Sequence, residues 1–180
     1  MTRGGDNRSE PPVRVLGIDP GTAVTGWGVI ERRRGTVTHL AHGAVATQSR
    51  QSLGDKLAAI HRALVGLCDE WRPDVLALER NFVGRNIQSA FRIGEVRGVA
   101  LLVAATAGLP IAEYAPATVK LAVTGSGRAE KDHVQRAISR ELGVAEPMVA
   151  DAADALAIAL CHLLSSRFAA VLAAASAGPR

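Results

Sequence analysis

Apolar residues recur along this chain with two different spacings, which separate the expected strands from the expected helices. The run 13–19 is short and rich in β-branched residues, and Pro20-Gly21 closes it, as is typical of a buried strand ending in a turn. Between 53 and 71 the apolar positions recur at helical spacing, with a capping pair, Ser52 and Asp55, at the start. The same criteria predict strands at 13–19, 27–30, 36–46, 75–79 and 111–114, and helices at 53–71, 89–107, 117–123, 130–142 and 149–173.

The order of these elements predicts the fold class. Three consecutive strands with short connections form an antiparallel meander, and the alternation of strands and helices that follows is typical of a mixed sheet with helices on both faces. We therefore expect an α/β fold of the ribonuclease H-like type, with a five-stranded sheet. No repeat or break in composition divides the chain, so the prediction is one domain over 13–172, a disordered extension over 1–12 and a flexible tail over 173–180.

Composition narrows the class of protein without identifying a function. The 180 residues are 48% hydrophobic and 21% charged, which excludes wholesale disorder. The chain has no apolar run long enough to cross a membrane and no signal peptide, so we expect a cytoplasmic protein. Cys68 and Cys161 lie in apolar helical stretches and are expected to be reduced core cysteines. A net charge of +4 is compatible with a nucleic-acid partner but does not establish one.

Four of the 17 acidic residues stand in apolar surroundings. Asp19 and Glu79 end two apolar strands, whereas Asp151 and Asp154 open a helix built mainly of Ala, Leu and Ile. Buried carboxylates are costly unless they are paired or bind metal, and four together would repel one another. Oxygen ligands in this number favour two Mg²⁺ ions, with Mn²⁺ as a substitute, over Zn²⁺. Carboxylates that hold two such ions are typical of phosphodiester hydrolysis.

Each of these acids also has a purely structural interpretation. Asp151 and Asp154 lie on one face of the first helical turn, where the helix dipole favours acidic residues. Asp19 precedes a Pro-Gly turn, where aspartate is common. Glu79 is followed closely by two arginines, and either could pair with it. From the residues alone, both interpretations remain open.

Several segments of the chain resemble the bacterial Holliday-junction resolvases of the RuvC family. The matching segments are 17–22, 25–30, 78–82, 115–120, 127–131 and 150–159. They occur in the family's order and extend the resemblance over about 13–167. The resemblance implies a ribonuclease H-like nuclease that cuts four-way junction DNA with Mg²⁺, acts as a homodimer and cooperates with the RuvAB branch-migration complex. It assigns the metal-binding catalytic cluster to Asp19, Glu79, Asp151 and Asp154.

The resemblance also implies roles for two of the chain's three lysines. It places Lys120 and Lys131 at the DNA as catalytic residues. All other basic residues except Lys56 are arginines, so lysine at both positions is notable. An ammonium group acts as a compact point charge on a scissile phosphate, unlike the planar guanidinium group. Lys56, in contrast, is interpreted as a solvated helix residue.

One aromatic residue and four arginines complete the expected DNA contacts. Phe82 stands in a polar, basic segment, where it either folds back into the core or, as the resemblance implies, stacks as a wedge on unpaired bases at the junction centre. The nearby arginines are expected to contact phosphates. They are Arg80, Arg85, Arg92 and Arg97.

The symmetry of a four-way junction predicts a two-fold symmetric homodimer. Gly94 and Gly98 give the second helix a small-residue face that either admits a partner helix or packs against its own sheet. Three other classes of protein were weighed against a junction resolvase. A different ribonuclease H-like nuclease acting on RNA or another DNA structure would share the acids. An actin-like ATPase needs more than 180 residues, and a catalytically silent DNA-binding module would not depend on the acids for activity.

Overall fold

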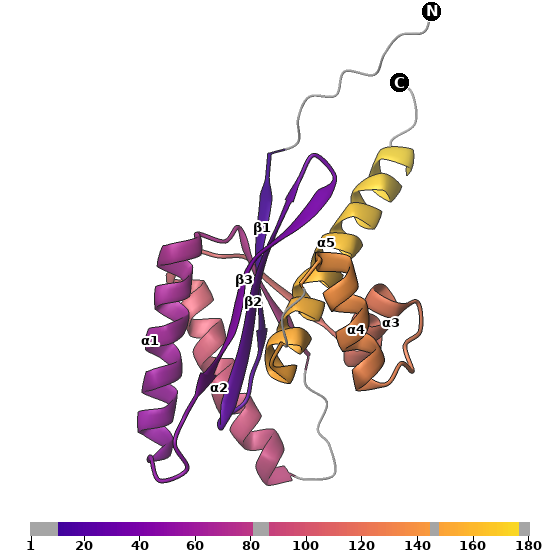
Figure 1. Ribbon diagram of the computed structural model, residues 1–180. Helices are drawn as coiled ribbons and strands as arrows, with labels where there is room; N and C mark the ends of the chain where they lie inside the picture. The colour runs from indigo at the N-terminus through magenta and orange to yellow at the C-terminus, as the bar shows by residue number, and fades with distance from the viewer. Residues whose placement is uncertain (1–10, 81–86, 145–147, 177–180) are drawn as a thin grey trace, which may run out of the picture.

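The computed structural model describes residues 11–80, 87–144 and 148–176 (Figure 1). Its elements are β1 (Val13–Asp19), β2 (Val24–Arg33), β3 (Thr36–Ala46), α1 (Leu53–Trp71), β4 (Val75–Glu79), α2 (Ile87–Thr106), β5 (Ile111–Tyr114), α3 (Pro116–Thr124), α4 (Lys131–Leu142) and α5 (Ala150–Ser176). This order confirms the predicted succession of strands and helices. None of the described helices has the length and apolar character that would carry it across a membrane.

The largest departure from the predicted boundaries is in β2. It was expected over 27–30, where the apolar residues are, but it spans Val24–Arg33. Its outer residues adopt strand geometry because they pair with β1 on one side and with β3 on the other. At the C-terminal end of the chain, α5 continues to Ser176, beyond the expected helix end at 173. The domain limits at 13 and 172 stay a prediction.

The five strands form one sheet in the order β3-β2-β1-β4-β5. β1 pairs antiparallel with β2 and parallel with β4, and β4 pairs parallel with β5. Because β1 and β4 are parallel, with Ile18 opposite Leu78, their carboxyl ends lie side by side. This register brings Asp19 and Glu79, the last residues of the two strands, to one edge of the sheet.

Helices cover both faces of the sheet, as predicted, with α1 and α2 on one face and α3, α4 and α5 on the other (Figure 1). Successive side chains of β1 and β4 point to opposite faces, so each face has its own core. On the α1/α2 face the buried strand residues are Leu16, Ile18, Leu76 and Leu78. On the α5 face they include Val15, Ile30 and Ala77.

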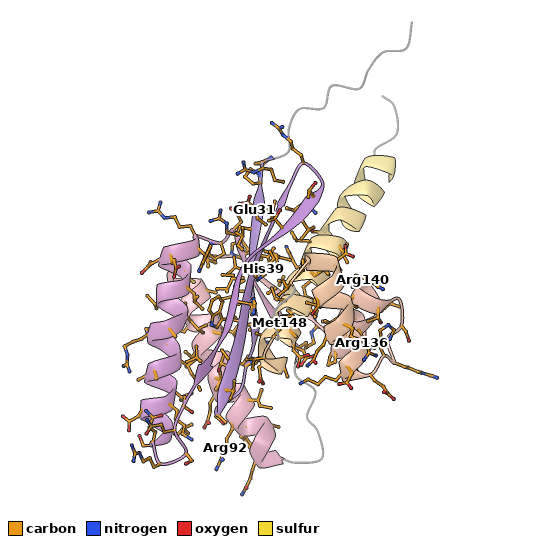
Figure 2. The ribbon with its side chains drawn as sticks, viewed as in Figure 1. Glu31, His39, Arg92, Arg136, Arg140 and Met148 are labelled. Atoms are coloured by element: carbon orange, nitrogen blue, oxygen red, sulfur yellow. The ribbon has the colours of Figure 1, made fainter. Side chains whose placement is uncertain are left out.

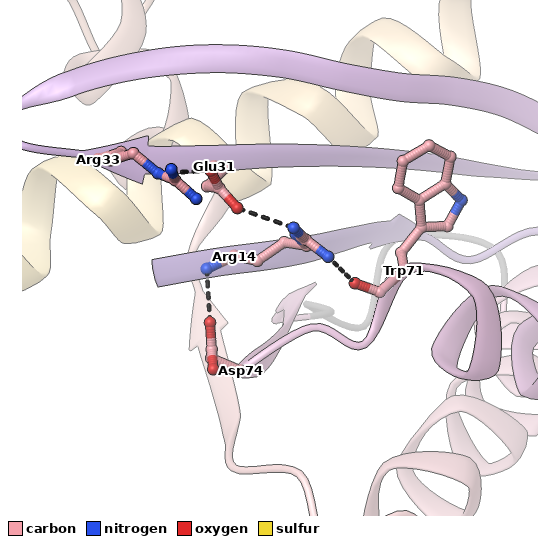
Figure 3. Close-up of polar contacts among 5 residues, drawn as sticks. All are labelled: Arg14, Glu31, Arg33, Trp71 and Asp74. Atoms are coloured by element: carbon pink, nitrogen blue, oxygen red, sulfur yellow. Dashed lines mark hydrogen bonds and ion pairs between the residues drawn. The ribbon is translucent and has the colours of Figure 1, made fainter. Parts of the chain in front are cut away.

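A polar network fixes the end of β1 that lies away from Asp19 (Figure 3). The guanidinium group of Arg14 donates to Glu31 Oε2 on β2, at 2.8 Å, and to the backbone carbonyl of Trp71 at the end of α1. The backbone N–H of Arg14 donates to Asp74 Oδ2 at 2.7 Å. The start of β1 is thereby joined to β2, α1 and the chain entering β4.

Two local predictions are confirmed. At the start of α1 the N–H of Asp55 donates to Ser52 Oγ at 3.2 Å, and the Ser52 hydroxyl group donates to the Asp55 carboxylate at 2.6 Å. Cys161 is buried and Cys68 is half-buried, and both are free thiols. Burial raises the pKa of both thiols, which keeps them protonated and unreactive.

Candidate active site

Helix α5 lies directly on β1 and β2 because three strand glycines leave room for it. A Cβ atom at Gly17 or Gly26 would lie well under 3.0 Å from a backbone oxygen of α5, and one at Gly28 would collide with a leucine side chain of that helix. Close-packed interiors do not tolerate such overlaps. We call these three residues the glycine seat. Any larger residue there would push α5 away from the sheet.

The glycine seat determines where the acidic start of α5 lies. Gly26 is opposite Asp19 in the β1–β2 register, and a Cβ on Gly26 would overlap the carbonyl group of Asp151. The first turn of α5 is therefore held over the end of β1. Asp154 follows Asp151 by three residues and lies on the same side of the helix.

Three of the four predicted carboxylates line one pocket of about 180 Å³, together with both predicted lysines. We call it the carboxylate pocket. Asp19 comes from β1, Glu79 from β4 and Asp154 from α5, while Lys120 comes from α3 and Lys131 from the start of α4. Its apolar walls are Pro116, Val119, Val134, Ala157 and Ile158.

Asp151 does not line the carboxylate pocket, but it is half-buried and its charge acts on Asp19. The interpretation of Glu79 as the partner of a neighbouring arginine can be compared with the structure for Arg80 alone, because Arg85 lies outside the described residues. Among the described residues Glu79 has no ion pair, and the side chain of the adjacent Arg80 is exposed.

The electrostatics of the carboxylate pocket are dominated by uncompensated negative charge. Burial, followed by the charges of Asp154, Glu79 and Asp151, raises the pKa of Asp19 to about 7. Burial and the Asp154 charge also raise the pKa of Glu79, against the opposing effect of the two lysines. The cations among the described residues therefore do not neutralise the cluster, and an additional cation would stabilise the ionised carboxylates.

Lys131 makes the direct ion pair within the pocket, with its Nζ atom 2.7 Å from Asp154 Oδ2. The hydrogen bond to Asp154 raises the pKa of Lys131. The side chains of Lys131 and Asp154 are 56% and 28% exposed. Because water competes at this exposure, the pair is weakly held and Lys131 can turn toward a ligand.

The donor chemistry fits a hard divalent cation, since the convergent ligands are carboxylate oxygens. Across residues 11–80, 87–144 and 148–176, however, no three His, Cys, Asp or Glu side chains are already arranged to hold a metal ion. One oxygen of Asp154 is engaged by Lys131 instead. Lys131 therefore competes with a metal ion for this oxygen of Asp154.

The predicted DNA-contacting arginines lie in different environments. Arg80 is exposed at the end of β4, and Arg92 is exposed on α2. Arg97 instead forms an ion pair with Glu113 of β5, and its side chain is only 19% exposed. A phosphate would have to compete with Glu113 for Arg97. The remaining predicted contacts lie outside the described residues; they are Phe82 and Arg85.

Sequence reasoning missed two features that support the site. One is the glycine seat, for which the signal was glycine inside strands, a residue that strands tolerate where another backbone approaches closely. The other is the contact between Tyr114 and His162, whose Oη and Nδ1 atoms are 2.7 Å apart. Tyr114 pairs with Glu79 in the β4–β5 register, so this contact joins the strand beside Glu79 to α5. No local pattern in the sequence indicated it.

Comparisons with known proteins agree with this geometry. The family model described as Crossover junction endodeoxyribonuclease RuvC matches residues 15–162. A crossover junction endodeoxyribonuclease RuvC from Ruegeria pomeroyi is 46% identical over 150 residues, which cover 83% of this chain and 90% of the relative. One from Myxococcus xanthus is 46% identical over 170 residues, covering 93% of this chain and 88% of the relative.

Solved structures give the same result. Thermus thermophilus RuvC, in complex with a Holliday junction substrate, matches with a TM-score of 0.82 and 33% identity over 87% of this chain and 96% of that one. The yeast mitochondrial Holliday junction resolvase Ydc2 matches with a TM-score of 0.61 at 16% identity, which reflects the shared fold. The predicted ribonuclease H-like fold is confirmed. The chain therefore belongs to the RuvC family of crossover junction endodeoxyribonucleases.

Proposed function

We propose that the protein resolves Holliday junctions in recombination and repair, by nicking two strands of like polarity at symmetric positions. The observation that carries this proposal is the carboxylate pocket, where acids from β1, β4 and α5 meet two lysines in a chain of this family. No feature of the described residues favours the alternative, a ribonuclease H-like nuclease acting on RNA or on another DNA structure.

Family membership implies a divalent metal ion, and we propose two Mg²⁺ ions per site, with Mn²⁺ as a substitute. The residues that would hold them are Asp19, Glu79, Asp151 and Asp154. When bound, the ions supply activation of the attacking water and stabilisation of the leaving 3′ oxygen. The raised pKa of Asp19 supports this assignment, because it reflects burial of the carboxyl group and then the charges of three neighbouring acids.

The chain's own residues position the substrate. Lys120 and Lys131 line the carboxylate pocket from α3 and α4, so their ammonium groups can bind the scissile phosphate. Lys131 would exchange its hydrogen bond to Asp154 for one to the phosphate. The glycine seat keeps Asp151 and Asp154 in register with Asp19 while the DNA binds. Hydrolysis leaves a 5′-phosphate and a 3′-hydroxyl group, which a ligase can rejoin.

The remaining contacts are proposals of the same kind. Phe82 would stack on bases at the junction centre, and the arginines would bind backbone phosphates. These are Arg80, Arg85, Arg92 and Arg97. We also propose that the protein works in the cytoplasm with the RuvAB branch-migration complex as partner.

The outer face of α2 supports a homodimer. Phe91 and Leu102 are 71% and 56% exposed there, and a Cβ atom on Gly94 or Gly98 would meet nothing within 4 Å. The opposite face of α2 packs on the sheet through residues such as Val96. The two glycines therefore do not pack against their own sheet. We propose that a second copy covers this face, giving two carboxylate pockets related by two-fold symmetry.

Sedimentation of a Leu102→Glu variant tests the dimer. The charge would be buried against a second copy, so the dimer dissociation constant should rise by about tenfold or more. Leu121→Glu, an equally exposed leucine on α3, is the matched control and should sediment as the wild type. If both variants sediment as the wild type, α2 is not the dimer surface.

A cleavage assay tests the function itself. A synthetic mobile four-way junction, labelled in turn on each strand, should receive paired symmetric nicks with Mg²⁺ and none with EDTA. Duplex DNA and an RNA–DNA hybrid of the same sequence are the competing substrates. Equal or faster cutting of either one would contradict the proposal and favour the alternative nuclease.

A further inference from the structure

A second pocket, of about 230 Å³, adjoins the loop that follows Asp19. Its walls come from the β1–β2 loop, the segment after β3, the first turn of α1 and the second turn of α2. They are Thr22, Ser49, Gln51, Leu53, Lys56 and Arg92. We call it the basic pocket. Figure 2 labels Arg92 at the lower end of the molecule, where α1 and α2 begin.

The basic pocket holds two cations for which the described chain supplies no acid partner. Neither Lys56 nor Arg92 forms an ion pair with any described residue. Asp55, the acid next to Lys56 in sequence, accepts a hydrogen bond from the hydroxyl group of Ser52 instead. Lys56 was interpreted as a solvated helix residue, but it lines a pocket with a second cation. Thr22 and Ser49 add hydroxyl groups that can donate to an anion.

The walls of the basic pocket are fixed by hydrogen bonds. The Thr47 hydroxyl group donates to the carbonyl of Thr22 at 2.6 Å, and the Thr47 N–H donates to the carbonyl of Ala23 at 2.9 Å. The segment after β3 is closed by Gln48, whose N–H donates to Gln51 Oε1 at 2.7 Å. The pocket is therefore tied to the loop that carries Asp19.

This connection places the basic pocket within a few nucleotides of the cut. Thr22 follows Asp19 by three positions, so the Cα atoms of these two residues lie at most about 11 Å apart. A DNA strand carries one phosphate per about 3.4 Å of helix axis. A strand whose scissile phosphate lies in the carboxylate pocket therefore has further phosphates at the distance of the basic pocket.

We propose that the basic pocket binds one backbone phosphate of the junction DNA, a few nucleotides from the cut, through Lys56, Arg92 and the two hydroxyl groups. This inference rests on the proposed function, because it needs junction DNA in the carboxylate pocket. The bound phosphate fixes the position of the strand relative to Asp19. Lys56 and Arg92 are positioning residues in this role, since they do not touch the reacting phosphate.

The first test measures junction binding by fluorescence anisotropy in EDTA, where no cutting occurs. Lys56→Gln and Arg92→Gln should each weaken binding by about fivefold and reduce the salt slope by about 1. Their combination should weaken binding less than the product of the two effects, because both act on one phosphate. Arg62→Gln, an exposed arginine of α1 outside the pocket, is the control and should bind as the wild type.

The second test locates the phosphate. Junctions with one methylphosphonate, which removes a single backbone charge, are compared position by position. One position within a few nucleotides of the cut should weaken binding to the wild type but not to Lys56→Gln. The proposal is overturned if no position behaves in this way, or if Lys56→Gln binds every junction as tightly as the wild type.

Two further readouts separate the possible explanations. If inorganic phosphate stabilises the wild type thermally but not Lys56→Gln, while both bind the junction equally, the pocket takes free phosphate and the DNA assignment is wrong. Cleavage by the wild type with Mg²⁺ is scored separately. A wild type that binds through the basic pocket but does not cut would refute the proposed function and leave this inference standing.

Discussion

Charged side chains are paired with one another at the start of β1, whereas at its other end like charges lie close together. At the start of β1, the Arg14 guanidinium group donates to Glu31 at 2.8 Å, and the backbone N–H of Arg14 donates to Asp74 at 2.7 Å (Figure 3). The chain itself therefore supplies the partners of these groups. At the other end of β1, burial and then the charges of three neighbouring carboxylates raise the pKa of Asp19 to about 7. At the start of β1 the charged groups are paired within the described chain, although Arg14 Nε itself has no hydrogen-bond partner there. We call this the complete end in the sense of paired charges, and the end at Asp19 the incomplete end.

This difference separates structural charges from functional ones. A buried charge that the chain itself neutralises needs no external ligand, and removing its partner destabilises the fold. A cluster left with excess charge is maintained at a cost in stability, which is typical of sites that bind an external ion. The carboxylate pocket keeps negative charge that its two lysines do not offset, while no acidic residue lines the basic pocket. Metal ions would offset the charge of the carboxylate pocket, and a DNA phosphate would offset that of the basic pocket.

The largest effect should follow from removing one acid from the incomplete end. Asp154→Asn or Asp19→Asn should lower the rate of junction cleavage by about 10³-fold or more, because the metal ions lose a ligand. Junction binding in EDTA should remain within a few-fold of the wild type. Glu31→Gln, at the complete end, is the control and should cut at nearly the wild-type rate. Full Mg²⁺-dependent cleavage by either Asn variant would remove that residue from the mechanism.

The next effect concerns the glycine seat that holds the acids together. A Cβ at Gly17 would overlap a backbone oxygen of α5, so Gly17→Ala should destabilise the protein by about 3 kcal/mol and reduce cleavage as well. Gly66→Ala on α1 meets nothing within 4 Å and should stabilise by about 0.5–1 kcal/mol. Urea denaturation measures both. If the two variants behave alike, close packing of α5 is not what positions the acids.

The acids and lysines of the site could be predicted from the sequence because their signals are local. Asp19 and Glu79 each interrupt an apolar run at a strand end, and lysine stands out at two positions in an arginine-rich chain. The parallel register of β1 and β4 then brings the two acids together. Such features depend on neighbours in sequence and on general rules of sheet topology.

Features that depend on contacts between distant segments could not be predicted in this way. The ion pair of Arg97 with Glu113, sixteen residues later on an adjacent element, gave no local sign in the sequence. Lys56 gave no local sign of the basic pocket, whose walls come from four separate segments. The length of β2 likewise follows from its two partner strands rather than from its own apolar residues.

The pH dependence of stability should distinguish the two ends of β1 in the metal-free protein. The pKa of Asp19 rises from 3.8 to about 7 on folding, so between these values the folded state binds more protons than the unfolded state. Stability therefore falls as the pH rises toward 7, and it stays low above that value.

Asp19→Asn removes the contribution of this carboxyl group to the pH dependence. In EDTA at pH 8 it should be more stable than the wild type by about 2 kcal/mol, a value reduced from the full shift for solvent screening. Glu31→Gln should instead lose about 1.5 kcal/mol, because Arg14 keeps its charge without its partner. Urea denaturation at pH 4, 6 and 8 measures the free energy of unfolding of both variants and of the wild type. If Asp19→Asn is only as stable as the wild type at pH 8, the ionised Asp19 carboxylate does not destabilise the folded protein.

The smallest effect should come from the ion pair of Lys131 with Asp154, at the incomplete end. The Lys131 side chain is 56% exposed, and pairs with such exposure contribute about 0–1 kcal/mol, so Lys131→Met should change stability in EDTA by less than about 0.5 kcal/mol. The Arg14–Glu31 pair, with side-chain exposures of 31% and 13%, should contribute more. A loss for Lys131→Met that exceeds the loss for Glu31→Gln would reverse this order. Lys131 would then be a structural partner of Asp154 rather than a cation free to turn to the scissile phosphate.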